Sequence, residues 1–291
     1  ICEGLVGSEM CIRDSFTSGH QPSEDGGAFK MGGTYIRELN TSRGGQTEHA
    51  CMPGCLIKCS NVYVDNTGRE IVSPMEYETI CLLGTNCGLE DPDDVARMNE
   101  IANDLGVDSI ELGATIAVLM DAGKGDFGDV AFMKEVTSEM MAGSENGKFY
   151  ATGTARVGEA LNFKRVPVIK KQAISAYDPR LIEVTGISMM LTAQGADHTV
   201  GNAATFKCDD KNVEELVAES LRMQINAAVA DSLGLCVFGR SVTDENLELI
   251  ANAINDAFDA GVTPDFIRNI GVETLRCLLY TSDAADELRS V

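Results

Sequence analysis

The apolar positions of the chain follow a helical period over most of its length after Met75. Asp91 and Pro92 place a capping side chain before a proline at the first helical position, and Gly106 can end the helix that follows. Residues 109–124 have the apolar density of a buried helix. Further helices are predicted over residues 129–143, 181–194, 212–234, 243–258 and 263–276.

One short stretch follows a strand period instead. Residues 61–72, NVYVDNTGREIV, alternate strand-forming residues around a turn at Asp65 to Gly68, which predicts a β-hairpin. Residues 16–48 are rich in Gly, Ser and Thr without a sustained period, so we expect them to be loop-rich. The predicted fold class is therefore mainly α. Clustered bases and two prolines near residue 165 separate a central region, residues 16–165, from a C-terminal helical region, residues 166–276.

Both ends of the chain resemble translated adapter sequences from transposase-based DNA library preparation. A DNA sequence that can encode Met10 to Asp14 has a reverse complement that, read one base out of register, encodes Leu278 to Thr281. Natural termini have no reason to derive from complementary strands. We therefore expect residues 1–15 and 277–291 to be non-native tails, and leave them out of fold reasoning.

The acidic charge of the chain limits the kinds of molecule that it is expected to bind. It carries 45 Asp and Glu against 23 Lys and Arg, a formal net charge of −22 at pH 7. This balance argues against nucleic acid and anionic membrane surfaces, and favours small molecules or a basic protein patch. No apolar run approaches the length of a membrane span. We expect a cytoplasmic protein, because no signal peptide is recognisable outside the tails.

Three cysteines lie close together in HACMPGCLIKCSN, residues 49–61. Cys51, Cys55 and Cys59 are each separated by three residues, and a triplet in a long acidic chain favours metal ligation over a disulfide framework. Such spacing suits an iron–sulfur cluster with three local ligands and a remote one, for which Cys236 is the candidate. Structural zinc stays open as an alternative, although zinc loops usually use cysteine pairs.

A weak internal repeat links two other segments. NDLGVDSIELG, residues 103–113, and DSLGLCVFG, residues 231–239, both place Asp or Asn three residues before a glycine and then an aliphatic residue. Each predicted helix closes there. The simplest interpretation is two ordinary helices that end in glycine, which is common just past a helix C-terminus.

Six short motifs together carry a resemblance to a known family. In chain order they are ACMPGCLIKCSN, EYET, ANDLGVDSIELG, AYDPR, GADHT and DSLGLC, and they span most of residues 50–240. They resemble the tungsten-containing aldehyde:ferredoxin oxidoreductase family. The resemblance implies helical central and C-terminal domains, a tungsten or molybdenum bis-pyranopterin centre beside one [4Fe–4S] cluster, and oxidation of aldehydes to acids with ferredoxin as the electron acceptor. The family's N-terminal β domain has no counterpart in this sequence.

The resemblance also implies roles for single residues. The implied cluster ligands are Cys51, Cys55, Cys59 and Cys236. Each repeat would hold one pterin, through Asn103, Val107 and Asp108 in the first and Asp231, Leu235 and Cys236 in the second. Because a pterin edge carries adjacent N–H donors, a carboxylate can accept two hydrogen bonds from it. Glu78, with Glu76 as the alternative, resembles the glutamate near the metal, and His198 resembles a histidine that could shuttle protons.

Some positions depart from the family pattern. The usual cluster loop has two residues between its first two cysteines, whereas this chain has three. Arg97 and Glu100 stand where some members carry an iron-binding Glu-x-x-His, so no interface iron is predicted, although a homodimer remains allowed. Cys81 and Cys87 match no motif and are expected to be buried structural thiols. Two other functions stay open: a cluster-only protein for electron transfer or assembly, and a zinc-stabilised helical interaction module.

Overall fold

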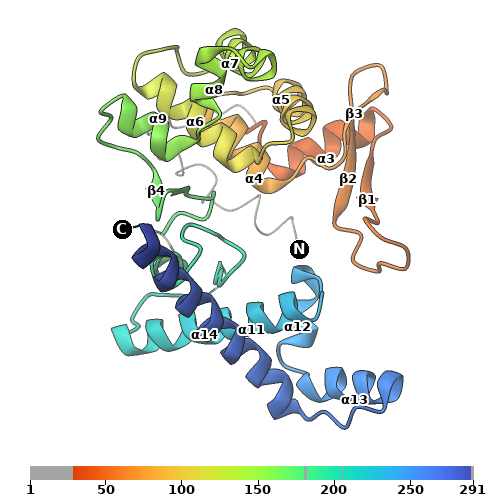
Figure 1. Cartoon of the computed structure of the whole chain (residues 1–291). Helices are drawn as coiled ribbons and strands as arrows, with labels where there is room; N and C mark the ends of the chain where they lie inside the picture. The colour runs from red at the N-terminus through yellow and green to blue at the C-terminus, as the bar shows by residue number, and fades with distance from the viewer. Residues whose placement is uncertain (1–28, 180–181, 205, 290–291) are drawn as a thin grey trace. The chain divides into compact units, whose positions relative to one another are not determined.

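The computed structural model describes residues 29–179, 182–204 and 206–289, and it divides into two compact units, Ile1–Asp178 and Pro179–Val291 (Figure 1). The predicted tail at residues 1–15 lies outside the described residues. Helices dominate both units, and the described strands are short. The prediction of a mainly α fold with a small hairpin is confirmed.

The first unit places three antiparallel strands beside a group of helices. The strands are β1 (Gln46–His49), β2 (Ser60–Val64) and β3 (Glu70–Val72), in the order β1-β2-β3. The helical segments are α3 (Gly33–Ser42), α4 (Tyr77–Thr79), η1 (Ile80–Gly84), η2 (Thr85–Cys87), α5 (Pro92–Leu105), α6 (Ser109–Asp121), α7 (Val130–Ala142), α8 (Glu145–Tyr150) and α9 (Thr154–Ala160). A two-stranded ribbon of β4 (Val168–Ile169) and β5 (Gln172–Ala173) follows α9.

Local capping explains where the central helices begin and end. The Asp91 side chain accepts a hydrogen bond from the Asp93 backbone N–H at the start of α5, and Gly106 takes a left-handed conformation with φ of 68° at its end. Both were predicted. Helix α6 is buried from Leu112 to Met120, as its apolar density indicates, and it forms the centre of the core. Cys81 and Cys87 are buried, as predicted, and burial raises the pKa of the Cys87 thiol to about 12.

The hairpin of β2 and β3 turns at Asp65 to Gly68, as predicted. The Asp65 carboxylate accepts hydrogen bonds from the backbone N–H groups of Thr67 and Arg69, and Gly68 adopts a φ of 82°. The expectation of loop-rich structure is wrong for residues 33–42, which form α3, and for residues 46–48, which belong to β1. Residues 16–28 lie outside the described residues. Helix α3 has no side-chain N-cap. Tertiary contacts stabilise it, because its Asn40 is buried and Ile36 packs against the core.

Arg43, Tyr63 and Asp93 join α3, β2 and α5. The Arg43 guanidinium forms two hydrogen bonds with the Asp93 carboxylate, at 2.5 and 3.2 Å, and the Tyr63 hydroxyl donates to the same carboxylate at 2.7 Å. Burial raises the pKa of Asp93, but the hydrogen bonds from Arg43 and Tyr63 outweigh it and hold that pKa below its usual value. The contribution of ionised Asp93 to the stability of the fold is therefore fully present above the unfolded-state pKa of the Asp93 carboxyl group, about 3.9. It is lost as the pH falls through the folded-state pKa of that group.

We expect Asp93→Asn to lower the free energy of unfolding of the first unit by roughly 1–3 kcal/mol at pH 7, because it removes charge-assisted hydrogen bonds. The difference from the parent chain should begin to shrink as the pH falls below about 4, the unfolded pKa, and should vanish once the pH is below the lowered folded pKa of Asp93. Urea unfolding at both pH values measures it. Asp94→Asn is the control, since the Asp94 carboxylate is partly exposed and lies 3.6 Å from the Arg97 guanidinium. An equal loss at both pH values would contradict the ionic contribution.

The regular structure that is described in the second unit is all helical. Its segments are α10 (Glu183–Leu191), α11 (Val213–Ser232), η3 (Val237–Gly239), α12 (Arg240–Thr243), α13 (Leu247–Phe258) and α14 (Pro264–Arg289). Helix α11 begins with a capping box of Asn212 and Glu215 and packs along α14, where a Cβ atom at Gly271 would lie 2.4 Å from the Ile225 carbonyl oxygen. Helix α14 continues beyond the predicted end at residue 276.

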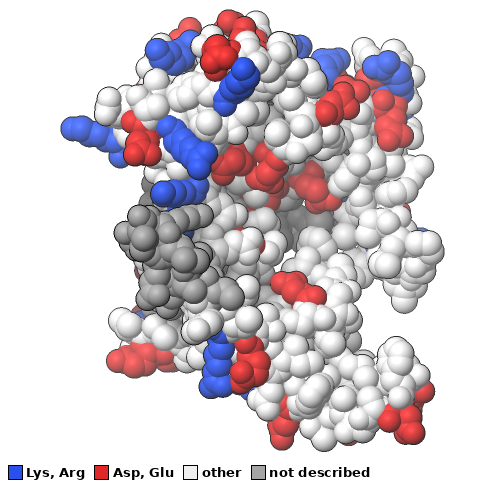
Figure 2. All heavy atoms as spheres, viewed as in Figure 1, with Lys and Arg blue, Asp and Glu red and all other residues white. Residues whose placement is uncertain are grey.

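The surface charge is dispersed on the visible face. Figure 2 shows acidic side chains over both units on that face, in keeping with the net charge of −22. Among the helices that the structure describes, none is both long enough and apolar enough to cross a membrane.

Candidate functional site

The cysteine triplet lies on the loop that joins β1 to β2. These strands pair His49 with Ser60 and Gln46 with Val62, so both ends of the loop are fixed in one ladder. Cys51 is exposed, while Cys55 and Cys59 are half-buried. The loop also exposes apolar side chains, since Leu56 is 93% and Met52 is 60% accessible.

The donor chemistry of this loop fits an iron–sulfur cluster. Thiolates at short spacing are the usual cluster ligands, and Gly54, with φ of 82°, and Lys58, with φ of 49°, let the backbone turn sharply between them. Across residues 29–179, 182–204 and 206–289, no three or more His, Cys, Asp or Glu side chains gather as they would around a metal ion. Cys236 is exposed in the second unit, at the residue before η3.

The first repeat connects α5 to α6. After Gly106, the Val107 N–H donates to the Ala102 carbonyl, a bond across the helix end that marks a Schellman turn. Asp108 then caps α6, since its carboxylate accepts from the Glu111 N–H at 2.8 Å. Asn103 and Asp108 are both exposed, so their side chains are accessible to a ligand.

The second repeat closes α11 in the same way. Gly234 has a φ of 65°, and the Leu235 N–H donates to the Ala230 carbonyl at 2.8 Å, matching the bond from Val107 in the first repeat. Asp231 and Cys236 are exposed. The two repeats therefore share a backbone turn, one in each unit, although Asp108 caps a full helix where Cys236 precedes only a short 3-10 turn.

Glu78 lies beside the first repeat. The neighbouring Thr79 hydroxyl is hydrogen-bonded to the Ser109 hydroxyl at 2.8 Å, which ties α4 to the residue that follows Asp108. The half-buried Glu78 carboxylate accepts from the Ala176 N–H at 2.8 Å. In the first unit, a hydrogen bond thus joins the residues that follow Glu78 and Asp108, two predicted site residues. Glu76, the alternative, is exposed as a whole residue. Protein atoms around its carboxyl group still displace some water, and this desolvation raises the pKa of that group.

His198 lies on the loop between α10 and α11. The preceding Asp197 carboxylate accepts from the Thr199 N–H and hydroxyl, and its oxygen lies 3.9 Å from the Nδ1 atom of His198. The buried Ser188 hydroxyl of α10 holds the middle of the loop by donating to the Gly201 carbonyl at 3.0 Å. Every residue of this arrangement belongs to the second unit.

The loop of His198 also lies near the second repeat. Partial burial raises the pKa of Asp231, Arg240 lowers it, and the negative charge of Asp197 raises it further. The contribution of Asp197 indicates that the His198 loop and the second repeat lie within electrostatic range of each other in the second unit.

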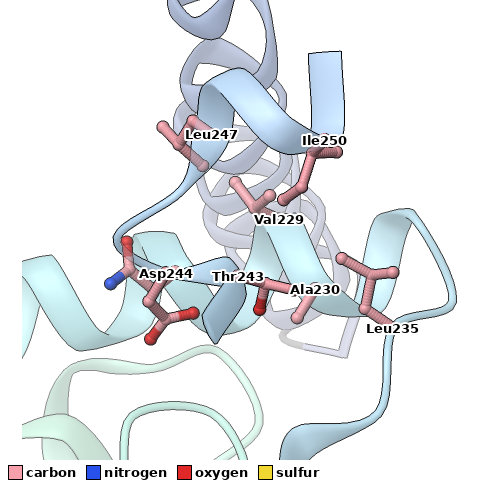
Figure 3. Close-up of a pocket in the computed structure, with 8 residues that line it drawn as sticks. Val229, Ala230, Leu235, Thr243, Asp244, Leu247 and Ile250 are labelled. Carbon is pink, nitrogen blue, oxygen red and sulfur yellow. The ribbon is translucent and has the colours of Figure 1, made fainter. Parts of the chain in front are cut away.

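A small pocket adjoins the second repeat and was not foreseen from the sequence. Figure 3 shows Leu235 pointing into it with Val229 and Ala230 from α11 and Leu247 and Ile250 from α13. Thr243 and Asp244 supply polar groups at its edge. Asp244 also pairs with the buried Arg240 at 3.1 Å, an ion pair at i and i+4 whose spacing was visible in the sequence.

Comparison with known proteins gives a consistent match. The family model "Aldehyde ferredoxin oxidoreductase, domains 2 & 3" matches residues 8–276. The tungsten-containing aldehyde ferredoxin oxidoreductase of Pyrococcus horikoshii is 28% identical over 210 residues, which cover 63% of this chain and 34% of that protein. The enzymes of the same name from Pyrococcus furiosus and Pyrococcus abyssi are 27% and 28% identical, over the same shares.

The matched segment thus spans about a third of the length of these relatives. The family model, by contrast, covers nearly the whole chain, including both repeats and the cysteine loop. The chain therefore belongs to the aldehyde ferredoxin oxidoreductase family, over that family's domains 2 and 3.

Proposed function

We propose that the protein oxidises an aldehyde to a carboxylic acid at a tungsten or molybdenum bis-pterin centre, and that the electrons leave through a [4Fe–4S] cluster to ferredoxin. The observation that carries the proposal is the backbone turn that the two repeats share. In the first unit the Val107 N–H donates to the Ala102 carbonyl after Gly106, and in the second the Leu235 N–H donates to the Ala230 carbonyl after Gly234. Each unit thus presents one repeat with an exposed carboxylate, Asp108 or Asp231, at which a pterin could bind.

The overall reaction sets what these residues must do. An aldehyde and one water molecule give a carboxylic acid, two protons and two electrons. The chemistry that the bound metal centre and cluster supply is the acceptance of the two electrons and their passage, one at a time, to ferredoxin. The protein must bind both groups, hold the aldehyde and accept the protons.

The two repeats would hold the pterins. Asp108 and Asp231 present exposed carboxylates that can accept hydrogen bonds from adjacent N–H donors. Asn103 offers an amide oxygen as an acceptor in the first repeat, and Val107 and Leu235 supply the backbone after each glycine turn. The cluster would be held by thiolates, for which the proposed set is Cys51, Cys55, Cys59 and Cys236.

Glu78 and His198 are the proposed proton acceptors. The backbone N–H of Ala176 fixes one oxygen of Glu78, which orients the carboxylate. The Nδ1 atom of His198 lies 3.9 Å from a carboxylate oxygen of Asp197. A glutamate and a histidine can together accept the two protons that the reaction releases.

The test is the composition of the full-length protein, produced without oxygen in the presence of tungstate and molybdate. We expect iron, sulfide, pterin and one of the two metals, with ferredoxin reduction that depends on an added aldehyde. Iron and sulfide without pterin would instead indicate a protein that binds only the cluster. A colourless protein that contains only zinc would indicate an interaction module.

A further inference from the structure

We propose that Asn61 is a positioning residue that couples the cysteine loop to the segment carrying Glu78. Asn61 lies on β2, two residues after Cys59, where the cysteine loop ends. Its side chain pairs with the backbone of Met75, three residues before Glu78. The proposal rests on the proposed function for its catalytic meaning, but the coupling itself is a property of the first unit.

Two hydrogen bonds form the link. The Asn61 Nδ2 group donates to the Met75 carbonyl at 2.9 Å, and Asn61 Oδ1 accepts from the Met75 N–H at 3.0 Å. The side-chain amide thus satisfies both polar groups of one residue, as a neighbouring strand would. Met75 is 4% exposed, so leaving either backbone group unpaired would be costly.

The sequence explains why a side chain is needed at this point. Strand β3 ends at Val72, and Pro74 has no N–H to continue the ladder with β2. The Ser73 hydroxyl closes the gap from the other side by donating to the Asn61 carbonyl at 2.9 Å. The buried amide of Asn99 on α5 donates to the Pro74 carbonyl at 3.0 Å. The segment leading into α4 is therefore held against β2 and α5.

The coupling extends from Asn61 to the cysteine loop on one side and to the α4 segment that carries Glu78 on the other. On one side, Ser60 is buried and paired with His49, so a shift of Asn61 moves the anchored end of the cysteine loop. On the other side, Met75 leads directly into α4, whose Thr79 is bonded to Ser109 beside Asp108. Asn61 thus connects the loop that would hold the cluster to the carboxylate and the repeat that would face the metal centre.

The test compares Asn61→Asp with Asn66→Asp. Both changes add one negative charge, but Asn66 is exposed in the hairpin turn. In Asn61→Asp, a carboxylate oxygen replaces the donor to Met75, so one hydrogen bond is lost and the other is kept. Hydrogen–deuterium exchange of the chain should accelerate about tenfold in peptides covering residues 50–60 and also in those covering 74–80, the change expected from losing one such bond. Asn66→Asp should leave both regions unchanged.

Exchange that accelerates only around Met75, or in neither region, would overturn the coupling. If Asn61→Asp fails to fold by circular dichroism, Asn61→Ser takes its place, since it removes both hydrogen bonds without adding a charge.

The catalytic meaning is tested in the full-length protein loaded with its cofactors. We expect Asn61→Asp to keep its iron and sulfide, to shift the midpoint potential of the cluster away from that of Asn66→Asp, and to lower kcat about tenfold with KM unchanged. An unchanged potential and kcat would reduce Asn61 to a structural role and overturn the proposal. Absence of iron and pterin from the parent protein would instead refute the proposed function, while hydrogen exchange still decides the coupling.

Discussion

Gly113→Ala should lower the free energy of unfolding of the first unit by about 3 kcal/mol, at the upper end of the range for overpacked cores. Gly113 lies in the middle of α6, where the helix crosses η1. A Cβ atom built there would lie 2.4 Å from the Leu82 carbonyl oxygen and 2.9 Å from the Leu83 nitrogen. Both atoms belong to the backbone, so no side chain can rotate away, and α6 and η1 must separate.

This loss would run against local helix preference. Alanine favours a helix interior over glycine by about 1 kcal/mol, so the sign of the effect isolates the contact between the helices. Gly239→Ala is the matched control, because it makes the same chemical change where no atom lies within 4 Å. Urea unfolding of the three chains measures the difference. A midpoint for Gly113→Ala equal to that of the parent would show that α6 and η1 separate without cost.

The same substitution affects the candidate site. Segment η1 directly follows α4, whose Thr79 hydroxyl is bonded to Ser109 at the start of α6. Moving η1 away from α6 therefore disturbs the bond between Thr79, which follows Glu78, and Ser109, which follows Asp108. Glycine at position 113, the last residue of the first repeat, is thus explained by packing rather than by contact with a ligand.

Local signals predicted the central helices well. The Asp91 cap, the Pro92 start and the Gly106 end of α5 each depend on contacts within one turn, and all three are present. Helix α3 and strand β1 were missed, because their stability depends on distant partners. The buried Asn40 amide of α3 donates to the Val62 carbonyl on β2 and accepts from the Val64 N–H, contacts that no local period reveals.

The candidate site shows the same division. Spacing alone singled out the cysteine loop and the two repeats, because those patterns are short. The bond between Thr79 and Ser109 spans 30 residues and the bond from Ala176 to Glu78 spans 98, so neither proximity was predictable from the sequence. Asn61 stood at the end of the cysteine motif, and the only signal of its role was Pro74, which interrupts the strand that would otherwise pair with it.

Cys236→Ala in the full-length protein should abolish the visible absorption of the iron–sulfur cluster, because a cluster of this kind needs four thiolates and a methyl group cannot replace one. Absorption spectra and iron content of anaerobically purified protein measure the loss. Cys208→Ala is the matched control in the same unit, since Cys208 is half-buried and belongs to no motif. Its Sγ atom lies 3.8 Å from the Phe206 carbonyl oxygen.

The position of Cys236 makes this variant informative about both proposed cofactors. Its neighbour Leu235 is fixed by the turn that closes α11, so the backbone of the second repeat should survive the loss of one exposed thiol. Pterin content should therefore be kept while iron falls. If the spectrum were unchanged, Cys236 would leave the ligand set, and the fourth ligand would have to come from outside the second repeat. Loss of pterin together with iron would show that the cluster and the second repeat assemble as one site, because the Asp231 carboxylate is unchanged in the variant.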